Sequence, residues 1–158
     1  MSWNRKKPYL CGTMSNLKDY GTGWRKEVTK WLKQYRIIAY DPCLEETKEH
    51  KKYDLTKIVK NNWEGIPQLL QEEIINKDLR QIRYFTNFII CFFTRYSTGT
   101  VSELSFALYF KIPVYFVTIR KLKGWPLTVA NSEGNKIFKC FADLKRYLKI
   151  KYKLKKRA

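Results

Sequence analysis

The chain has 158 residues, of which 44% are hydrophobic, and this is enough material for one globular domain with its own core. With 32 Lys and Arg residues against 14 Asp and Glu, the formal net charge is +18, which favours anionic partners such as nucleotides or nucleic acid. A single histidine, four widely spaced cysteines and the lack of a long apolar run argue against Ser-His-Asp catalysis, Cys/His zinc sites and a membrane span. We therefore expect a soluble, cytoplasmic protein with reduced thiols.

In chain order, short apolar runs alternate with stretches of helical spacing. Residues 8–14 predict a buried first strand, and apolar side chains at helical spacing over 24–35 predict an amphipathic helix. Residues 36–40 predict a second buried strand that stops at Asp41-Pro42, because proline disfavours helix for the residue before it. The charged segment 44–63 is irregular and is interpreted as a short helix or a mobile segment.

The second half of the chain has the stronger periodicity. Residues 66–85 predict a long amphipathic helix with Pro67 in its first turn, and the apolar run 87–94 predicts a central strand covered on both faces. Helices are also expected over 100–110 and 141–148, and strands over 112–117 and 136–138.

This alternation of strands and helices is typical of a parallel sheet with helices on both faces. We expect a single Rossmann-like α/β domain with a five-stranded parallel sheet over residues 1–150, and a basic tail over 151–158. Ligands of such sheets bind beyond the carboxyl ends of the strands, so the loops after the strands are the expected site.

The segment from Ser97 to Glu103 lies between a central strand and a helix. Gly99 allows the backbone to approach a ligand, and the start of a helix favours an anion. The positive end of the helix dipole also lowers the pKa of a carboxylate in the first turn, which would keep Glu103 ionised as a nucleophile. Alternatively, Thr100 and Glu103 form a capping box, in which Glu103 only satisfies a backbone N–H.

Three further features could carry chemistry, each with a plainer alternative. Asp78 lies late on the long helix, and its plainer alternative is an exposed helical acid. Tyr9 lies on the first strand, and its plainer alternative is a core aromatic. The Gly21-x-Gly23-Trp24-Arg25 segment lacks the third glycine of a dinucleotide fingerprint. It fits a phosphate-contacting loop or a plain loop with a solvated arginine.

Read in order, these residues resemble the nucleoside 2-deoxyribosyltransferase family over roughly residues 8–118. The Gly99-Thr-Val-Ser-Glu103 segment, followed by a helix and the Ile112-Pro-Val114 strand, is the most specific part. The other matching segments are Tyr9-Leu-Cys-Gly-Thr-Met14, Asp19-x-Gly21, Trp24-Arg25, Asp41-Pro42 and Asp78-Leu-Arg80.

The resemblance implies a flavodoxin-like fold, a homo-oligomer, and transfer of a deoxyribosyl group between nucleobases without a metal or cofactor. By position, Glu103 would be the nucleophile, Asp78 the acid/base and Tyr9 the residue that orients Glu103. Two carboxylates in different environments suit glycosyl transfer, since they can divide the acid and nucleophile roles. The residues expected to bind the nucleoside or nucleotide are Gly12, Met14, Asp19, Trp24, Arg25, Asp41, Ser97, Gly99 and Thr100.

Ser97 departs from the best-known transferases, which have an aspartate at that position for the sugar 5′-hydroxyl. A serine resembles the related deoxynucleoside-monophosphate N-glycosidases, which accept a phosphate and release free base. Hydrolysis of monophosphates is therefore one alternative to transfer, and a non-catalytic nucleotide-binding module is another.

The basic segment from Lys145 to Arg157 suggests a further partner. Its lysines could bind nucleic acid, with Tyr147 and Tyr152 stacking on bases. The alternative, which we favour, is a solvated basic helix end.

Overall fold

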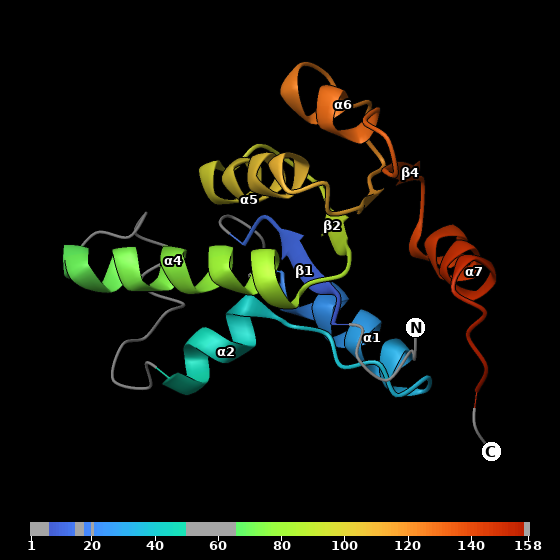
Figure 1. Cartoon of the computed structure of the whole chain (residues 1–158), viewed down its shortest axis with the longest axis horizontal. Coiled ribbons are helices and arrows are strands. Elements are labelled where there is room, and N and C mark those ends of the chain that lie inside the picture. Colours follow the sequence, from blue (N-terminus) through green and yellow to red (C-terminus); the bar gives the residue numbers. More distant parts are fainter. Residues whose placement is uncertain (1–6, 15–17, 20, 50–65, 157–158) are drawn as a thin grey trace.

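The computed structural model describes residues 7–14, 18–19, 21–49 and 66–156. Within them, helices and strands alternate along most of the chain (Figure 1). The elements are β1 (Tyr9–Gly12), α1 (Thr22–Lys33), α2 (Pro42–Glu49), α4 (Gln68–Phe85), β2 (Ile89–Phe92), α5 (Thr98–Tyr109), β3 (Val114–Val117), α6 (Trp125–Ala130), β4 (Lys136–Phe138) and α7 (Phe141–Lys151).

The sheet is parallel and has four strands among the described residues, in the order β1-β2-β3-β4. The prediction of five strands is wrong, because residues 36–40 contribute only an isolated parallel bridge from Tyr40 to Tyr9. Arg36 has a φ of 58°, which is outside the strand region, Ile38 is 69% exposed, and α2 begins at Pro42. The residues between Arg36 and α2 therefore form a single bridge instead of a strand. With Tyr40 beside β1, the spatial order is still that of a flavodoxin-like sheet.

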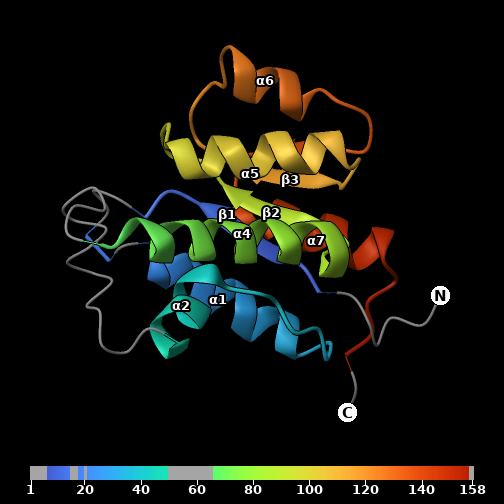
Figure 2. The same ribbon diagram turned by 60° about the vertical axis from the view of Figure 1, so that its left-hand side comes forward.

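Helices cover both faces of the sheet, as predicted. Figure 2 shows α5 and α6 on one side and α1 on the other. Successive side chains along each strand point to opposite faces of the sheet, which divides the core into two parts. Tyr9 and Cys11 pack toward α4 and α5, whereas Leu10 packs toward α1 and α7. Burial on both faces explains why the strand runs are continuously apolar.

The helix boundaries differ from the predicted ones by a few residues. Helix α1 begins at Thr22 and α5 at Thr98, each two residues earlier than predicted. Pro67 is the residue before α4 with a ψ of 135°, so its place in the first turn is a wrong prediction. Helix α2 occupies the start of the irregular segment, and residues 50–65 lie outside the described part of the chain.

The last helix is held against the sheet by aromatic side chains at its end. Helix α7 runs to Lys151, and the Tyr152 ring stacks on Phe88 with a centroid distance of 5.1 Å. The Tyr152 hydroxyl lies 2.8 Å from that of Tyr115 on β3. The chain therefore continues to pack on the core just beyond residue 150.

Candidate active site

A hydrogen bond between Tyr9 and Glu103 forms the centre of the site. The Tyr9 hydroxyl donates to Oε1 of Glu103 at 2.6 Å, which joins the start of β1 to α5. Tyr9 is fully buried, whereas Glu103 keeps partial exposure. A bond this short is typical of a charge-assisted contact, and it fixes the carboxylate that the sequence predicts as the nucleophile.

The pKa of Glu103 is raised by burial. Interactions with the Cys11 thiol and the Tyr9 hydroxyl lower it in turn, as does the positive charge of Arg25. The prediction of a lowered pKa from the start of the helix is therefore wrong. Helix α5 begins at Thr98, so Glu103 lies in the second turn, where the effect of the helix dipole has faded.

Ser97 caps α5, and the capping-box interpretation of Glu103 is wrong. The Ser97 hydroxyl oxygen accepts a hydrogen bond from the Thr100 backbone N–H at 3.3 Å and donates to the Thr100 hydroxyl at 2.8 Å. Gly99 is exposed, and a Cβ placed on it would meet no atom within 4 Å among the described residues. Ser97 thus caps the first turn of α5, and no described atom fills the space beside the Gly99 backbone.

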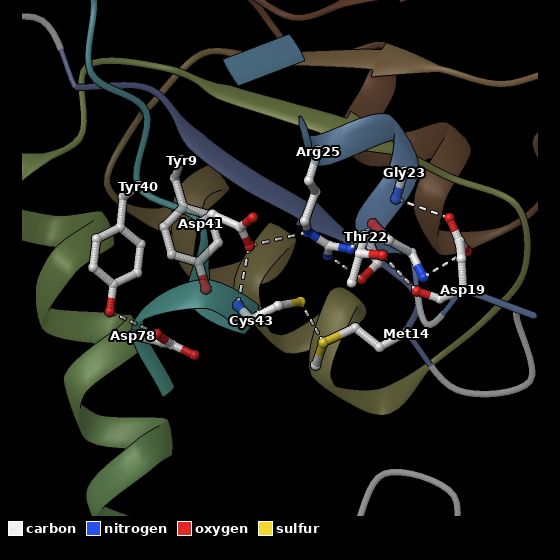
Figure 3. A network of polar contacts seen from close by, with 12 residues as sticks. Tyr9, Met14, Asp19, Thr22, Gly23, Arg25, Tyr40, Asp41, Cys43 and Asp78 are labelled. Carbon is white, nitrogen blue, oxygen red and sulfur yellow. Dashed lines mark hydrogen bonds and ion pairs between the residues drawn. The ribbon is translucent and has the colours of Figure 1, made fainter. Parts of the chain in front are cut away.

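Asp78 is buried on α4 with only 8% exposure, so the interpretation as an exposed acid is wrong. It lies between Ile74 and Ile82 on the stripe of α4 that faces the core. The Tyr40 hydroxyl donates to Oδ1 of Asp78 at 3.3 Å, and the Tyr40 ring stacks on Tyr9 at 5.5 Å (Figure 3).

The two stacked tyrosine rings connect the two carboxylates. One hydroxyl binds Glu103 and the other binds Asp78. Burial, followed by the negative charges of Glu103 and Asp78, raises the pKa of Tyr9 well above its ordinary value. Tyr9 therefore stays protonated and remains a hydrogen-bond donor at any working pH.

Arg25 is a buried cation beside this centre, and the interpretation as a solvated arginine is wrong. It is 1% exposed, and its two terminal nitrogens donate to the Gly21 and Gly12 carbonyls, each at 2.8 Å (Figure 3). Its Nε lies 3.6 Å from Oδ1 of Asp41. Burial raises the pKa of Asp41, which the charge of Arg25 opposes. These contacts join the loops that follow β1 and Tyr40.

Asp19 organises the start of α1. Its two carboxylate oxygens accept hydrogen bonds from the Gly21 and Gly23 backbone N–H groups at 3.0 and 2.8 Å, and these bonds lower its pKa. Gly21 has a φ of 71°, and a Cβ there would lie 2.6 Å from the Arg25 guanidinium. Glycine is therefore required at this turn by both backbone conformation and space.

The remaining predicted residues surround these groups. Trp24 is buried and stacks on Phe141, and its indole N–H has no hydrogen-bond partner within the described ranges. Met14 lies against Cys43 at the start of α2 (Figure 3). The Thr13 hydroxyl donates to the Arg95 carbonyl at 3.0 Å, which brings the loop after β1 to the loop before α5.

Two side chains at the centre were not singled out by sequence. Tyr40 belongs to a run that is predicted as a plain buried strand, and nothing local distinguishes its ring. Cys11 could have been found, since it lies two residues after Tyr9 and so on the same face of β1. Among the described residues, no group of three or more His, Cys, Asp or Glu side chains could hold a metal ion. Likewise, no described helix has the length and apolar character to cross a membrane.

The comparisons with known proteins bear on the fold. No protein-family model matches the chain, and no curated protein matches it in sequence. A solved structure of a 2-deoxyribosyltransferase from the psychrotolerant bacterium Bacillus psychrosaccharolyticus is similar, with a TM-score of 0.67 and 16% identity. The similarity covers 96% of this chain and 99% of that one. An identity this low shows the fold alone, so the chain shares the α/β fold of that 2-deoxyribosyltransferase over nearly its whole length.

Proposed function

We propose that the protein cleaves the N-glycosidic bond of 2′-deoxynucleosides or their monophosphates and transfers the deoxyribosyl group to a second nucleobase. The observation that carries this proposal is the Tyr9–Glu103 hydrogen bond of 2.6 Å, with the carboxylate held but still partly exposed. The fold shared with a 2-deoxyribosyltransferase supports the same conclusion.

In the first step, an oxygen of the Glu103 carboxylate attacks C1′ of the sugar. The bond from C1′ to the base nitrogen breaks, and its electron pair leaves with the base, which takes up a proton. A covalent ester between the sugar and Glu103 results. A second base then attacks C1′, loses a proton and frees Glu103, whereas attack by water would complete a hydrolysis instead.

Asp78 is the group proposed to exchange the proton with the base. It approaches the centre from α4, opposite Glu103 on α5, with the stacked tyrosines between them. Its burial on the core-facing stripe of α4 fixes the position of the carboxyl group relative to the stacked tyrosines. Tyr40 would orient it, as Tyr9 orients Glu103.

Glu103 must be ionised to attack, although burial disfavours its charge. The Tyr9 hydroxyl, the Cys11 thiol and the charge of Arg25 all favour the ionised form. Arg25 would act from a distance, because its terminal nitrogens are already bound to the Gly12 and Gly21 carbonyls. We propose that it holds the loop after β1 in shape and adds a fixed positive charge.

Hydrolysis of deoxynucleoside monophosphates is a second candidate, and the start of α5 favours it. Ser97 caps this helix without adding a negative charge, and the exposed Gly99 leaves room beside the first turn. The start of a helix attracts a phosphate. A net charge of +18 acts in the same direction.

Product analysis separates these functions in one assay. The protein is mixed with the four deoxynucleosides or their monophosphates, with and without a free acceptor base. Exchange of bases indicates transfer, whereas free base without exchange indicates hydrolysis. Glu103→Gln should abolish both, and Glu73→Gln, an exposed carboxylate on α4, is the matched control that should keep them. Ligand binding without turnover of any substrate would leave only a binding module.

A further inference from the structure

Among the helices that the structure describes on the two faces of the sheet, positive charge lies mainly on one face. Helices α1 and α7, which share that face, contain seven Lys and Arg residues besides the buried Arg25, against two acidic ones, Glu27 and Asp143. Helices α4, α5 and α6 on the opposite face contain three basic residues against four acidic ones. Among these helices, the exposed positive charge therefore lies mainly on the α1/α7 face, which does not carry the Tyr9–Glu103 pair.

Helices α1 and α7 lie next to each other, so their outer sides form one surface. The Trp24 ring on α1 stacks on Phe141 of α7 with a centroid distance of 5.8 Å. Farther along, the Lys145 ammonium lies 5.9 Å from the centroid of the Trp31 ring. We call the exposed side of the two helices the basic face.

Two rows of cations follow the helices along the basic face. Exposed cations occur at i, i+4 and i+7 on α1 and at i, i+3 and i+7 along α7 and the turn that follows it. The rows consist of Lys26, Lys30 and Lys33, and of Arg146, Lys149 and Lys153. Arg146 also pairs with Asp143 at 3.2 Å, but both side chains are largely exposed and such a pair is weak.

The spacing of the α1 row fits a phosphate backbone. Seven residues of helix rise by about 10 Å, so the three cations of the α1 row are spread over that length, whereas Lys153 of the second row lies beyond the end of α7. One strand of a duplex has a phosphate for about every 3.4 Å of the helix axis. The α1 row is therefore long enough to contact consecutive phosphates of one strand, and the α7 row adds further contacts.

We propose that the basic face binds the phosphate backbone of a nucleic-acid duplex without reading its sequence. A single strand is disfavoured because its recognition depends on aromatic rings that stack on bases. The rings near this face are already engaged, since Trp31 is 9% exposed and Tyr152 contacts Phe88 and Tyr115. Tyr147 likewise packs on Tyr115 and Phe138, so the prediction that Tyr147 and Tyr152 stack on bases does not suit this structure.

A membrane surface is also disfavoured as the partner. Stable binding to a bilayer needs buried apolar area in addition to positive charge. The apolar sides of both helices are already packed on the sheet, as the low exposure of Leu32 and Leu148 shows. Ile150 is the one large apolar side chain of these two helices that is strongly exposed.

The test measures affinity for a short DNA duplex of mixed sequence as a function of salt concentration. A triple variant, Lys26→Gln, Lys30→Gln and Lys33→Gln, removes the α1 row. The matched control removes three exposed lysines near α5 and α6 by Lys111→Gln, Lys121→Gln and Lys123→Gln. Circular dichroism and nucleoside turnover of the α1-row variant verify that the fold is intact.

We expect the slope of log K against log salt to become shallower by about 3 in the α1-row variant, with a loss of affinity of about tenfold or more. The control variant should change the slope much less. Equal losses in the two variants would overturn the proposal, because the attraction would then come from net charge alone. It would also be overturned by tighter binding to a single strand, or to vesicles that contain anionic lipid, than to the duplex.

Discussion

Replacing Tyr9 by phenylalanine tests whether its hydroxyl keeps Glu103 ionised. The variant retains the ring that stacks on Tyr40 at 5.5 Å and removes only the 2.6 Å hydrogen bond. A hydrogen bond to a charged group contributes about 1.5–3 kcal/mol, and one pKa unit corresponds to about 1.4 kcal/mol. Because the lost bond favours the carboxylate, the pKa of Glu103, already raised by burial, should rise further in the variant.

The assay is the pH dependence of kcat/KM for a deoxynucleoside. Only ionised Glu103 attacks, so the activity of Tyr9→Phe should fall away at a higher pH than that of the unmodified protein, and the loss should be smallest at alkaline pH. Tyr84→Phe, an exposed tyrosine on α4, is the control. An acid limb that stays in place, or moves to lower pH, while the fold is intact would refute the assigned role of Tyr9.

Three other substitutions give distinct results. Glu103→Gln should raise Tm at neutral pH. A carboxyl group whose pKa is raised in the folded state destabilises the fold once the pH exceeds the ordinary glutamate pKa of 4.5, and glutamine removes this effect. The gain in Tm should therefore vanish in thermal melts below pH 4.5. Asp78→Asn should lower kcat by about a hundredfold or more for ordinary bases, but much less for a base that leaves without protonation, and equal losses for both would contradict the proton-transfer role. Ser97→Asp should keep the helix cap, since Asp is also a good N-cap, yet lower monophosphate turnover relative to nucleoside turnover about tenfold by repelling the phosphate. An unchanged ratio would show that Ser97 does not face the 5′ position.

The sequence predicted best those strands whose residue pattern follows from a single physical requirement. Continuously apolar runs identified β2 and β3, because strands covered on both faces need no polar side. The segment before Asp41 was misjudged, because an apolar run does not show that Pro42 will start a helix directly after it. Nor does an apolar run show how many backbone hydrogen bonds it will form with the neighbouring strand.

The candidate site was predictable as a set of residues but not as an arrangement. Helical spacing places Asp78 on the same stripe as Ile74 and Ile82, so its burial could have been inferred. The stacking of Tyr40 on Tyr9 could not, because it depends on how a non-strand segment lies against β1. Nor could the raised pKa of Glu103, which follows from burial by several elements rather than from its place on α5.

The pairing of β1 with β2 has a consequence for how activity arises during folding. Tyr9 lies opposite Ile89 in the sheet, although 80 residues separate them in the chain, and the Tyr9–Glu103 bond spans 94. Closing so long a loop is entropically costly and makes the pairing of such strands slow. Neither half of the chain contains both partners of this bond. Catalytic competence should therefore appear only at the last stage of folding, which makes enzyme turnover a sensitive reporter of the fully assembled protein.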